Sequence, residues 1–445
     1  MMSESESEGK LDFKLTFYIG LAFFTTGISW SLYNTQVNQQ LDNYFLGFAF
    51  AGFIVGVLMA VDNIVGVIIQ PIMGAFSDNT RTKYGRRIPF IIVGVIISAT
   101  FFALIPTGFN SQLWILLTWI FCFSVGMGFY RSQAVSLMPD FVKPVHRSKA
   151  NAIINIMGGF GAIVAYTMGL VSDLIGLPII FIITSGIMIL AMLVLFFKVD
   201  ENKAYSYKLL LELESKEGTK SSDKKNKVGL LTSFKDILKE EDKSTLFILL
   251  AIFAWFIGYQ GLEALFSIYA GSGPNGVLLQ STGFSGFLFN FVAIPFILAA
   301  YPLSLVASRI GRRRSIQIGL ILMISSMVVG FLIQTLTVTM IILVIFGIGW
   351  AFVNVNSIVI VWELAPSVEK IGTYTGVYYF FSVLAAIIGP GIVGGLRDLL
   401  GKNSLLIVGA IFIILAFVFM LFVKRGEVAL TEEEKLARQK KIAEL

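Results

Sequence analysis

Twelve apolar runs of about 20 residues limit this chain to one kind of fold. A helix of about 20 apolar residues crosses a hydrocarbon core of about 30 Å. Runs this long satisfy their backbone polar groups in lipid as helices rather than as barrel strands. The predicted fold class is therefore an all-α polytopic membrane protein with twelve transmembrane helices. They are expected near residues 15–37, 46–69, 89–107, 112–137, 152–172, 177–197, 245–270, 284–307, 316–336, 338–361, 372–395 and 404–423.

The first run follows the acidic, serine-rich segment MMSESESEGKLDFK, and no small-residue cleavage pattern comes after it. We expect it to remain as a membrane helix rather than be removed as a signal peptide. The single Cys122 and the single His146 provide neither an internal disulfide nor a metal cluster or Cys/His catalytic pair. A GxxxxGK[ST] loop is missing from the sequence, which argues against direct ATP coupling. We expect no enzymatic activity and no cofactor.

Basic residues gather on one side of the predicted membrane. Of the 34 Lys and Arg, only Arg131 lies in a run, and only Arg397 and Lys402 lie in loops opposite the N-terminus. The positive-inside rule assigns the basic side to the cytoplasm. The expected location is the cell membrane, with both termini cytoplasmic. The net charge of +6 is then a topology signal, and without a nucleic-acid motif or aromatic platform we expect no nucleic-acid partner.

One long polar stretch separates the sixth run from the seventh, and it divides the chain into two groups of six helices. The expected organisation is an N-terminal half over residues 1–197, a partly helical cytoplasmic linker over 198–244, and a C-terminal half with a cytoplasmic tail over 245–445.

The two halves also resemble each other in sequence. GMGFYRSQAVSLMPD aligns without gaps to GWAFVNVNSIVIVWE, and PIMGAFSDNTRTKYGRR matches PLSLVASRIGRR once five residues are dropped. A six-helix repeat in parallel order predicts a pseudo-twofold axis along the membrane normal, with binding sites between the halves near the midplane. The first alignment pairs Gln133 with Asn356, Asp140 with Glu363 and Arg147 with Lys370.

Three formal charges lie within the predicted helices: Asp62, Arg131 and Glu263. Each costs at least about 2.5 kcal/mol at the bilayer centre, so each should face a cavity or a partner. Asp62 is interpreted as a proton or cation acceptor, or as one half of a helix–helix hydrogen bond shared with Asn63. Arg131 could bind substrate hydroxyls or a carboxylate, or serve as a static ion-pair partner. Glu263 is interpreted as a group that accepts hydrogen bonds from the hydroxyls of a polyhydroxylated ligand and binds the coupling cation. The alternative is that it reaches water at the outer end of its helix.

Polar and aromatic side chains near these charges suit a polyhydroxylated ligand, because hydroxyls take hydrogen bonds and a sugar's C–H face stacks on a ring. For each aromatic alone, ordinary packing is the competing interpretation. The further substrate-binding candidates are Trp30, Asn34, Gln133, Tyr259, Gln260, Asn354, Asn356 and Tyr378.

Two loops carry a family resemblance. QPIMGAFSDNTRTKYGRRIPF resembles the loop between helices two and three of the major facilitator superfamily. Its long spacing, with six residues between Asp78 and Gly85, is similar to plant sucrose transporters, their animal relatives and the melibiose-permease group of glycoside:cation symporters. MPDFVKPVHRSKANAIINIMGGFGAI is similar to the same group's loop after helix four. The resemblance implies alternating-access sugar uptake coupled to a cation.

The chain also departs from that branch. Matched on the conserved proline, the two acidic positions of the melibiose permeases hold Gly66 and Gln70, and their sugar-binding acid on helix four matches Arg131. We therefore favour protons over sodium. The expected partners are a sugar, such as a disaccharide or other glycoside, a proton and the lipid bilayer, and we expect a monomer. The alternatives are a sodium-coupled sugar symporter, an exporter of amphipathic compounds, and a non-transporting receptor or scaffold.

The basic loops also predict a cytoplasmic gate. SRIGRRR carries Arg309 where the first-half loop carries Asp78. This asymmetry suggests that Asp78 pairs with cations nearby or across the halves when the cytoplasmic side is closed. Exposed pairs are worth only about 0 to 1 kcal/mol each, so a network is required. The alternative is that the basic loop does not gate and only anchors its two flanking helices at the cytoplasmic face. The gate candidates are Asp78, Arg86, Arg87, Asp140, Arg309, Arg312 and Glu363.

Overall fold

A computed structural model describes residues 11–109, 111–142, 146–204, 206–208, 242–365 and 371–426. Within these ranges twelve helical spans are long and apolar enough to cross a membrane, which confirms the predicted fold class. Most of the predicted linker, the end of the tail, and Lys370 with its pairing to Arg147 lie outside the described residues.

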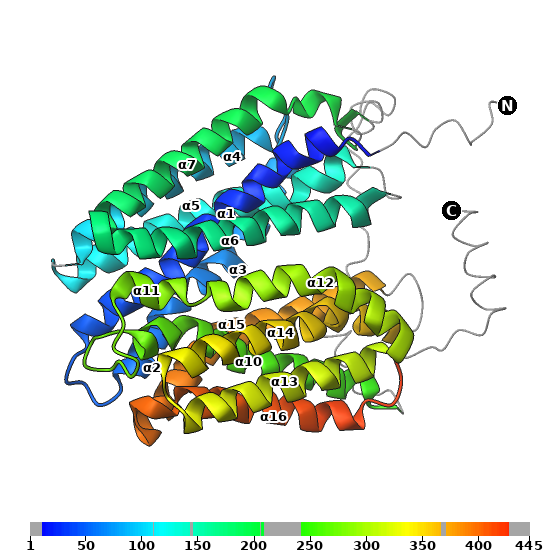
Figure 1. The fold of residues 1–445 in the computed structure, drawn as a ribbon. Helices are drawn as coiled ribbons and strands as arrows, with labels where there is room; N and C mark the ends of the chain where they lie inside the picture. Colours follow the sequence, from blue (N-terminus) through cyan, green and yellow to red (C-terminus); the bar gives the residue numbers. More distant parts are fainter. Residues whose placement is uncertain are drawn as a thin grey trace.

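The long helices fall into two groups, which Figure 1 shows in blue to green and in green to red. The first group comprises α1 (Phe13–Tyr44), α2 (Ala51–Met59), α3 (Val61–Asp78), α4 (Ile88–Leu104), α5 (Leu113–Phe141), α6 (Arg147–Ile175) and α7 (Leu177–Lys198). The second comprises α10 (Ser244–Ala270), α11 (Thr282–Phe287), α12 (Asn290–Ile310), α13 (Arg312–Leu332), α14 (Leu336–Leu364), α15 (Ile371–Leu400) and α16 (Leu405–Phe422).

Some helices extend beyond the apolar runs that predicted them. α1 continues through the polar residues after position 37 as far as Tyr44, and α15 continues to Leu400. The count of three membrane charges was therefore incomplete, because Asp42, Asp173, Arg397 and Asp398 also lie in spanning helices. Arg397 was wrongly placed in a loop. It lies in α15 and is 1% exposed.

Two predicted spans consist of two helices each. The second is divided into α2 and α3 at Ala60, and the eighth into α11 and α12. The division places Asp62 in the first turn of α3 rather than in the middle of a continuous helix. Discontinuous helices commonly form ion and substrate sites in membrane transport folds, because their ends carry partial charge at membrane depth.

The two groups contact each other at the end away from the chain termini (Figure 1). The hydrogen bonds described between them involve the second half of α1, the start of α2 and the last third of α6. α2 and α15 approach at backbone distance, since a Cβ added to Gly56 would lie 2.2 Å from the carbonyl oxygen of Pro390. We call this end the outer side and the end with the termini the inner side.

Candidate substrate and coupling site

The fold brings together the three charges that the sequence singled out. Asp62 on α3 interacts electrostatically with both Arg131 on α5 and Glu263 on α10. Asp62 and Glu263 are half-buried, and Arg131 is exposed. Two carboxylates and a guanidinium, contributed by both groups of helices, therefore lie near enough at membrane depth for the charges of Arg131 and Glu263 to act on Asp62.

Hydrogen bonds within its own helix hold the Asp62 carboxylate. Its Oδ1 accepts from the backbone N of Asn63 at 2.7 Å and from Asn63 Nδ2 at 2.9 Å. The Asn63 bond is therefore local to α3 and does not join two helices. A carboxylate in a first helical turn also faces the positive end of the helix dipole. These contacts favour the ionised form of Asp62, whereas its burial at membrane depth opposes that charge.

Glu263 lies between the two groups of helices. Asn34 Nδ2 on α1 is 3.5 Å from Glu263 Oε1, and Tyr259 and Tyr166 interact electrostatically with the same carboxylate. Tyr166 on α6 also forms a hydrogen bond with Ser31. No pattern in the sequence pointed to Tyr166, because a lone tyrosine in an apolar run is typical of packing.

Aromatic rings lie beside these polar groups. The ring of Tyr259 stacks on Trp350 at 4.2 Å between centroids, and Tyr166 stacks on Phe289 at 5.5 Å. Stacked pairs hold their rings rigidly and offer flat apolar faces next to polar edges. Trp30 instead packs against Tyr33 and Phe123. This agrees with ordinary packing, the competing interpretation for each aromatic residue.

Gln133 and Asn356, which the sequence repeat aligns with each other, form hydrogen bonds within the protein. Gln133 is 0% exposed. Its Nε2 donates to the carbonyl oxygen of Met73, and its Oε1 accepts from Arg87. Asn356 is buried and donates to the carbonyl oxygen of Phe352 on its own helix. In this conformation both amides form hydrogen bonds inside the protein, and contact of either one with a substrate stays a prediction.

The remaining substrate candidates lie in the second group of helices. Tyr378 on α15 is buried and shares a 3.1 Å hydrogen bond with Ser357 on α14. Gln260 on α10 and Asn354 on α14 are half-buried. Contact with a ligand remains a prediction for all three.

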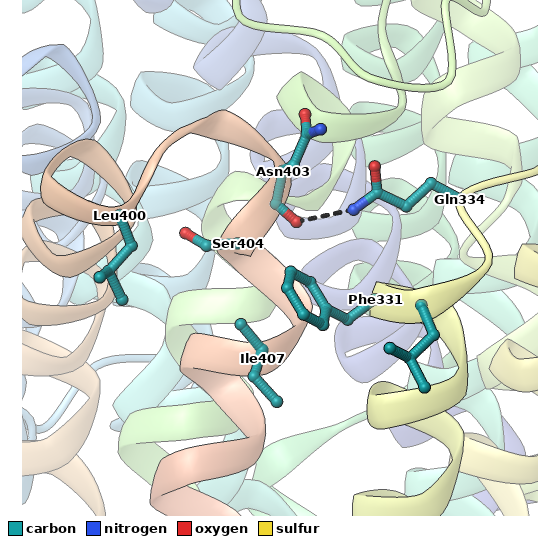
Figure 2. A pocket seen from close by; sticks show the side chains of 7 residues that line it. Phe331, Gln334, Leu400, Asn403, Ser404 and Ile407 are labelled. Carbon is teal, nitrogen blue, oxygen red and sulfur yellow. Dashed lines mark hydrogen bonds between the residues drawn. The ribbon is translucent and has the colours of Figure 1, made fainter.

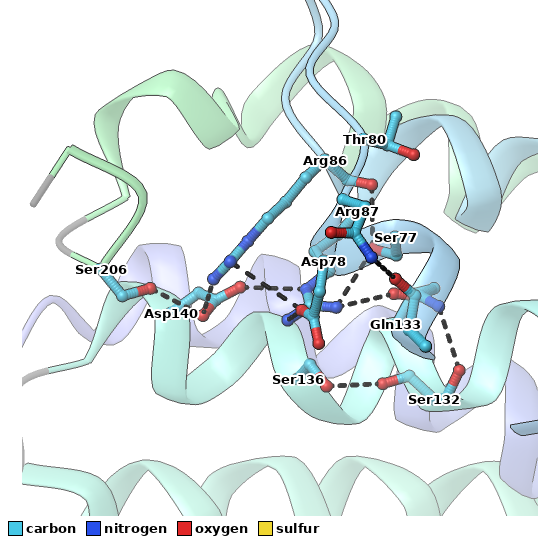
Figure 3. Close-up of polar contacts among 12 residues, drawn as sticks. Ser77, Asp78, Thr80, Arg86, Arg87, Ser132, Gln133, Ser136, Asp140 and Ser206 are labelled. Carbon is cyan, nitrogen blue, oxygen red and sulfur yellow. Dashed lines mark hydrogen bonds and ion pairs between the residues drawn. The ribbon is translucent and has the colours of Figure 1, made fainter. Parts of the chain in front are cut away.

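The basic loop forms a compact network on the inner side, which we call the charge cluster (Figure 3). Arg87 Nη2 lies 2.7 Å from Asp78 Oδ1, and Arg87 Nε lies 3.2 Å from Asp140 Oδ2. Arg86 Nη2 approaches Asp140 Oδ1 at 2.9 Å. Arg87 Nη1 donates to Ser77 and to Gln133. The charge cluster comprises Ser77, Asp78, Arg86, Arg87, Gln133, Asp140 and Ser206, which donates to Asp140.

The pairs of the predicted gate lie within single halves. The charge cluster belongs to the first group of helices, and Arg312 pairs with Glu363 at 3.1 Å in the second. Arg309 is exposed. In this conformation Asp78 pairs with nearby cations, and the pairing across the halves is not seen among the described residues. Release of these cations when the cytoplasmic side opens stays a prediction.

A residue that the sequence analysis missed supports the charge cluster. Glu201, just after α7, is 0% exposed. Its carboxylate accepts from the backbone N of Arg87 at 2.8 Å and of Ile88 at 2.9 Å. It thereby satisfies N–H groups at the start of α4 that have no partner within the helix. Burial raises the pKa of Glu201, and the backbone hydrogen bonds oppose that shift.

Replacing Gln133 tests the structure of the charge cluster. We expect Gln133→Leu to lower the free energy of unfolding by about 1 to 3 kcal/mol, because it leaves buried partners without their hydrogen bonds. The matched control is Gln40→Leu, the same change at a half-buried residue. Thermal unfolding in detergent measures both. Equal stability of the two variants would contradict the described contacts.

One described cavity lies elsewhere. It has a volume of about 550 Å³ and is found at the outer ends of α13, α15 and α16 (Figure 2). Its lining is Phe331, Leu332, Gln334, Leu400, Asn403, Ser404 and Ile407. None of its lining residues is charged, and none lies on the helices that carry Asp62, Arg131 and Glu263, so volume alone does not identify the site.

A membrane protein of two six-helix groups, with charges and aromatic rings between them, has the architecture of a transporter. The chain belongs to the Major Facilitator Superfamily, whose family model matches residues 15–279 and 274–444. The resemblance seen in the loops is thereby confirmed.

Partial matches to curated proteins agree. The chain is 31% identical over 126 residues to lactose permease of Lactobacillus helveticus, covering 26% of this chain and 19% of that protein. It is 26% identical over 164 residues to sucrose transport protein SUC3 of Arabidopsis thaliana, covering 32% and 26%. It is 32% identical over 124 residues to proton-associated sugar transporter A of Mus musculus, covering 24% and 16%. The matches thus span about a quarter or less of these relatives, which are transport proteins rather than enzymes.

Solved structures match over nearly the whole chain. A bacterial homologue of the human lysosomal transporter Spinster, in an inward-facing, unoccupied conformation, has a TM-score of 0.71 at 14% identity, covering 94% of this chain and 98% of that one. The nucleoside transporter NupG has a TM-score of 0.67 at 13% identity, covering 93% and 100%. At this identity the likeness concerns the fold alone.

Proposed function

We propose that this protein imports a sugar, such as a disaccharide or other glycoside, together with a proton by alternating access. The observation that carries the proposal is the placement of Glu263 at the interface between the two groups of helices, beside Asn34, with its charge and that of Arg131 acting on Asp62. The partial similarity to lactose, sucrose and proton-associated sugar transporters supports the substrate class. The polar and aromatic surroundings of Glu263 also suit sugar hydroxyls and ring faces.

In the proposed mechanism, Asp62 or Glu263 takes a proton from the outer side. Neutralising either carboxylate changes its attraction to Arg131 and so alters the relative energies of the two arrangements of the halves. A sugar bound between the halves is then released on the inner side. The proton gradient supplies the energy, since one charge moving through 100 mV yields about 2.3 kcal/mol.

The placement in the cell is part of the same proposal. We place the protein in the cell membrane as a monomer, with two six-helix halves over residues 1–197 and 245–445 and a cytoplasmic linker over 198–244. The concentration of Lys and Arg on the inner side supports cytoplasmic termini.

Sugar counterflow tests the substrate class without requiring a gradient. Purified protein in liposomes preloaded with one unlabelled sugar should take up the same labelled sugar from outside, for at least one member of a panel of disaccharides and glycosides. Counterflow of amphipathic compounds with none of the sugars would instead favour the exporter. Failure of every compound would favour a receptor or scaffold.

A further inference from the structure

The outer half of α1 is unusually polar for a membrane-spanning helix, and three of its polar residues lie on one face. Asn34, Asn38 and Asp42 follow one another at intervals of four. Residues four apart lie on the same side of a helix, about 6 Å from one to the next along its axis. We call these three residues the polar stripe.

Each residue of the polar stripe forms a hydrogen bond across the interface between the two groups of helices. Asn34 is the innermost and contacts Glu263. Asn38 Nδ2 donates to the carbonyl oxygen of Ala264 at 2.6 Å, and its Oδ1 accepts from Ser267 Oγ at 2.9 Å. The contacts follow the same order along both helices, so the polar stripe lies in register with α10.

The outermost residue of the polar stripe, Asp42, is linked through Asn275 to a second buried charge, Arg397. Asp42 accepts two hydrogen bonds from Asn275 Nδ2, at 2.9 and 3.1 Å. The carbonyl oxygen of Asn275 accepts from Arg397 Nη2 at 2.8 Å. Asp42 and Arg397 are both buried and interact electrostatically. Separate polar contacts thus succeed one another along the interface, from the candidate coupling residue Glu263 to its outer end.

Polar contacts suit a surface that must separate. A hydrogen bond contributes little net stability when water replaces it on opening, whereas a buried group left without a partner is costly. The polar stripe therefore holds α1 on α10 while the outer side is closed. It also allows water or sugar hydroxyls to take over the same groups when the halves part.

We infer that the polar stripe is the gate on the outer side, and that Asn38 is the residue that positions α1 against α10 beside Glu263. The inference rests on the proposed sugar function for its trigger. A sugar hydroxyl that bonds to Glu263 displaces Asn34, the innermost contact, and leaves the outer two contacts easier to break. Site occupancy is in this way communicated to the outer side.

Distance measurements between the outer ends of the two halves test the gate directly. Spin labels at Phe48→Cys and Leu400→Cys, in a Cys122→Ser background, use positions that are 61% and 62% exposed. Without sugar, Asn38→Leu should raise the ratio of open to closed distances about tenfold, and the exposed Asn43→Leu should leave it unchanged. The same distribution in both variants would overturn the inference.

A second variant keeps the test independent of folding defects in Asn38→Leu. Ser267→Ala removes only the hydroxyl that donates to Asn38, so it should also raise the open fraction, by a smaller factor. Combined with Asn38→Leu it should add nothing, because the shared contact is already lost. Simple additivity of the two changes would show that Asn38 and Ser267 act separately, and would contradict the gate.

Adding sugar separates this inference from the proposed function. A transported sugar should raise the open fraction of the unmodified gate, and Asn38→Leu should lower the concentration needed for half-maximal uptake from outside. If Asn38→Leu opens the outer side and no sugar in the panel affects the unmodified gate, the gate stands and the sugar function fails. If sugars are transported but Asn38→Leu behaves like Asn43→Leu, the sugar function stands and the gate fails.

Discussion

Asp62→Asn is expected to abolish uphill accumulation of sugar while leaving sugar exchange intact. The amide keeps the size of the side chain and its acceptor oxygen for Asn63, but it cannot take up a proton. One proton moving with each sugar through 100 mV supports about a 50-fold accumulation. Without coupling, the inside and outside concentrations only become equal. Proteoliposomes with an imposed proton gradient measure the accumulation, and counterflow measures the exchange.

The matched control for this variant is Asp12→Asn. Asp12 is exposed and caps α1 by accepting from the backbone N of Leu15, a role that asparagine also performs well. Accumulation by Asp12→Asn should therefore match that of the unmodified protein. If Asp62→Asn also accumulated sugar normally, Asp62 would have no part in coupling, and Glu263 would be left as the candidate.

Arg87→Ala should lower the free energy of unfolding by about 3 to 5 kcal/mol, which is more than the loss expected for Gln133→Leu. Arg87 is buried and contacts Asp78, Asp140, Ser77 and Gln133. Its removal leaves the buried Asp140 with one guanidinium partner fewer, and breaking a buried pair costs far more than breaking an exposed one. Thermal unfolding in detergent measures the change.

Two further variants show whether geometry or charge matters at this position. Arg87→Lys keeps the charge but cannot form several directed hydrogen bonds at once, so it should restore only part of the lost stability. The exposed Arg309→Ala should unfold like the unmodified protein. Arg87→Ala with unchanged stability would mean that the charge cluster serves topology alone.

The fold could be predicted from the sequence because length and hydropathy decide which segments cross a membrane. The ends of the helices could not. The polar second half of α1 has no apolar signal, and residues such as Asn38 and Asp42 are helical and buried because they bond to the other half of the protein. Such partners are distant in sequence and become visible only in three dimensions.

Some residues of the candidate site could likewise be predicted from the sequence, and others could not. Asp62, Arg131 and Glu263 could be found from the sequence because an ionisable residue in a membrane helix is costly. Tyr166 carries no formal charge and gives no such signal. Glu201 resembled one more linker charge, because its role depends on the unpaired N–H groups at the start of α4. Gln133 was assigned to the substrate from its place in the repeat, whereas its contacts place it in the charge cluster.

The proposed mechanism has sugar uptake driven by protons. The most direct measurement is the ratio of inside to outside sugar in proteoliposomes under an imposed proton gradient, with and without a protonophore, compared with an equal sodium gradient. We expect accumulation well above unity with the proton gradient, its loss with the protonophore, and no accumulation with sodium alone. Accumulation with sodium alone would show that sodium, rather than the proton, is the coupling ion. An inside-to-outside ratio of sugar that never exceeds one would contradict symport altogether.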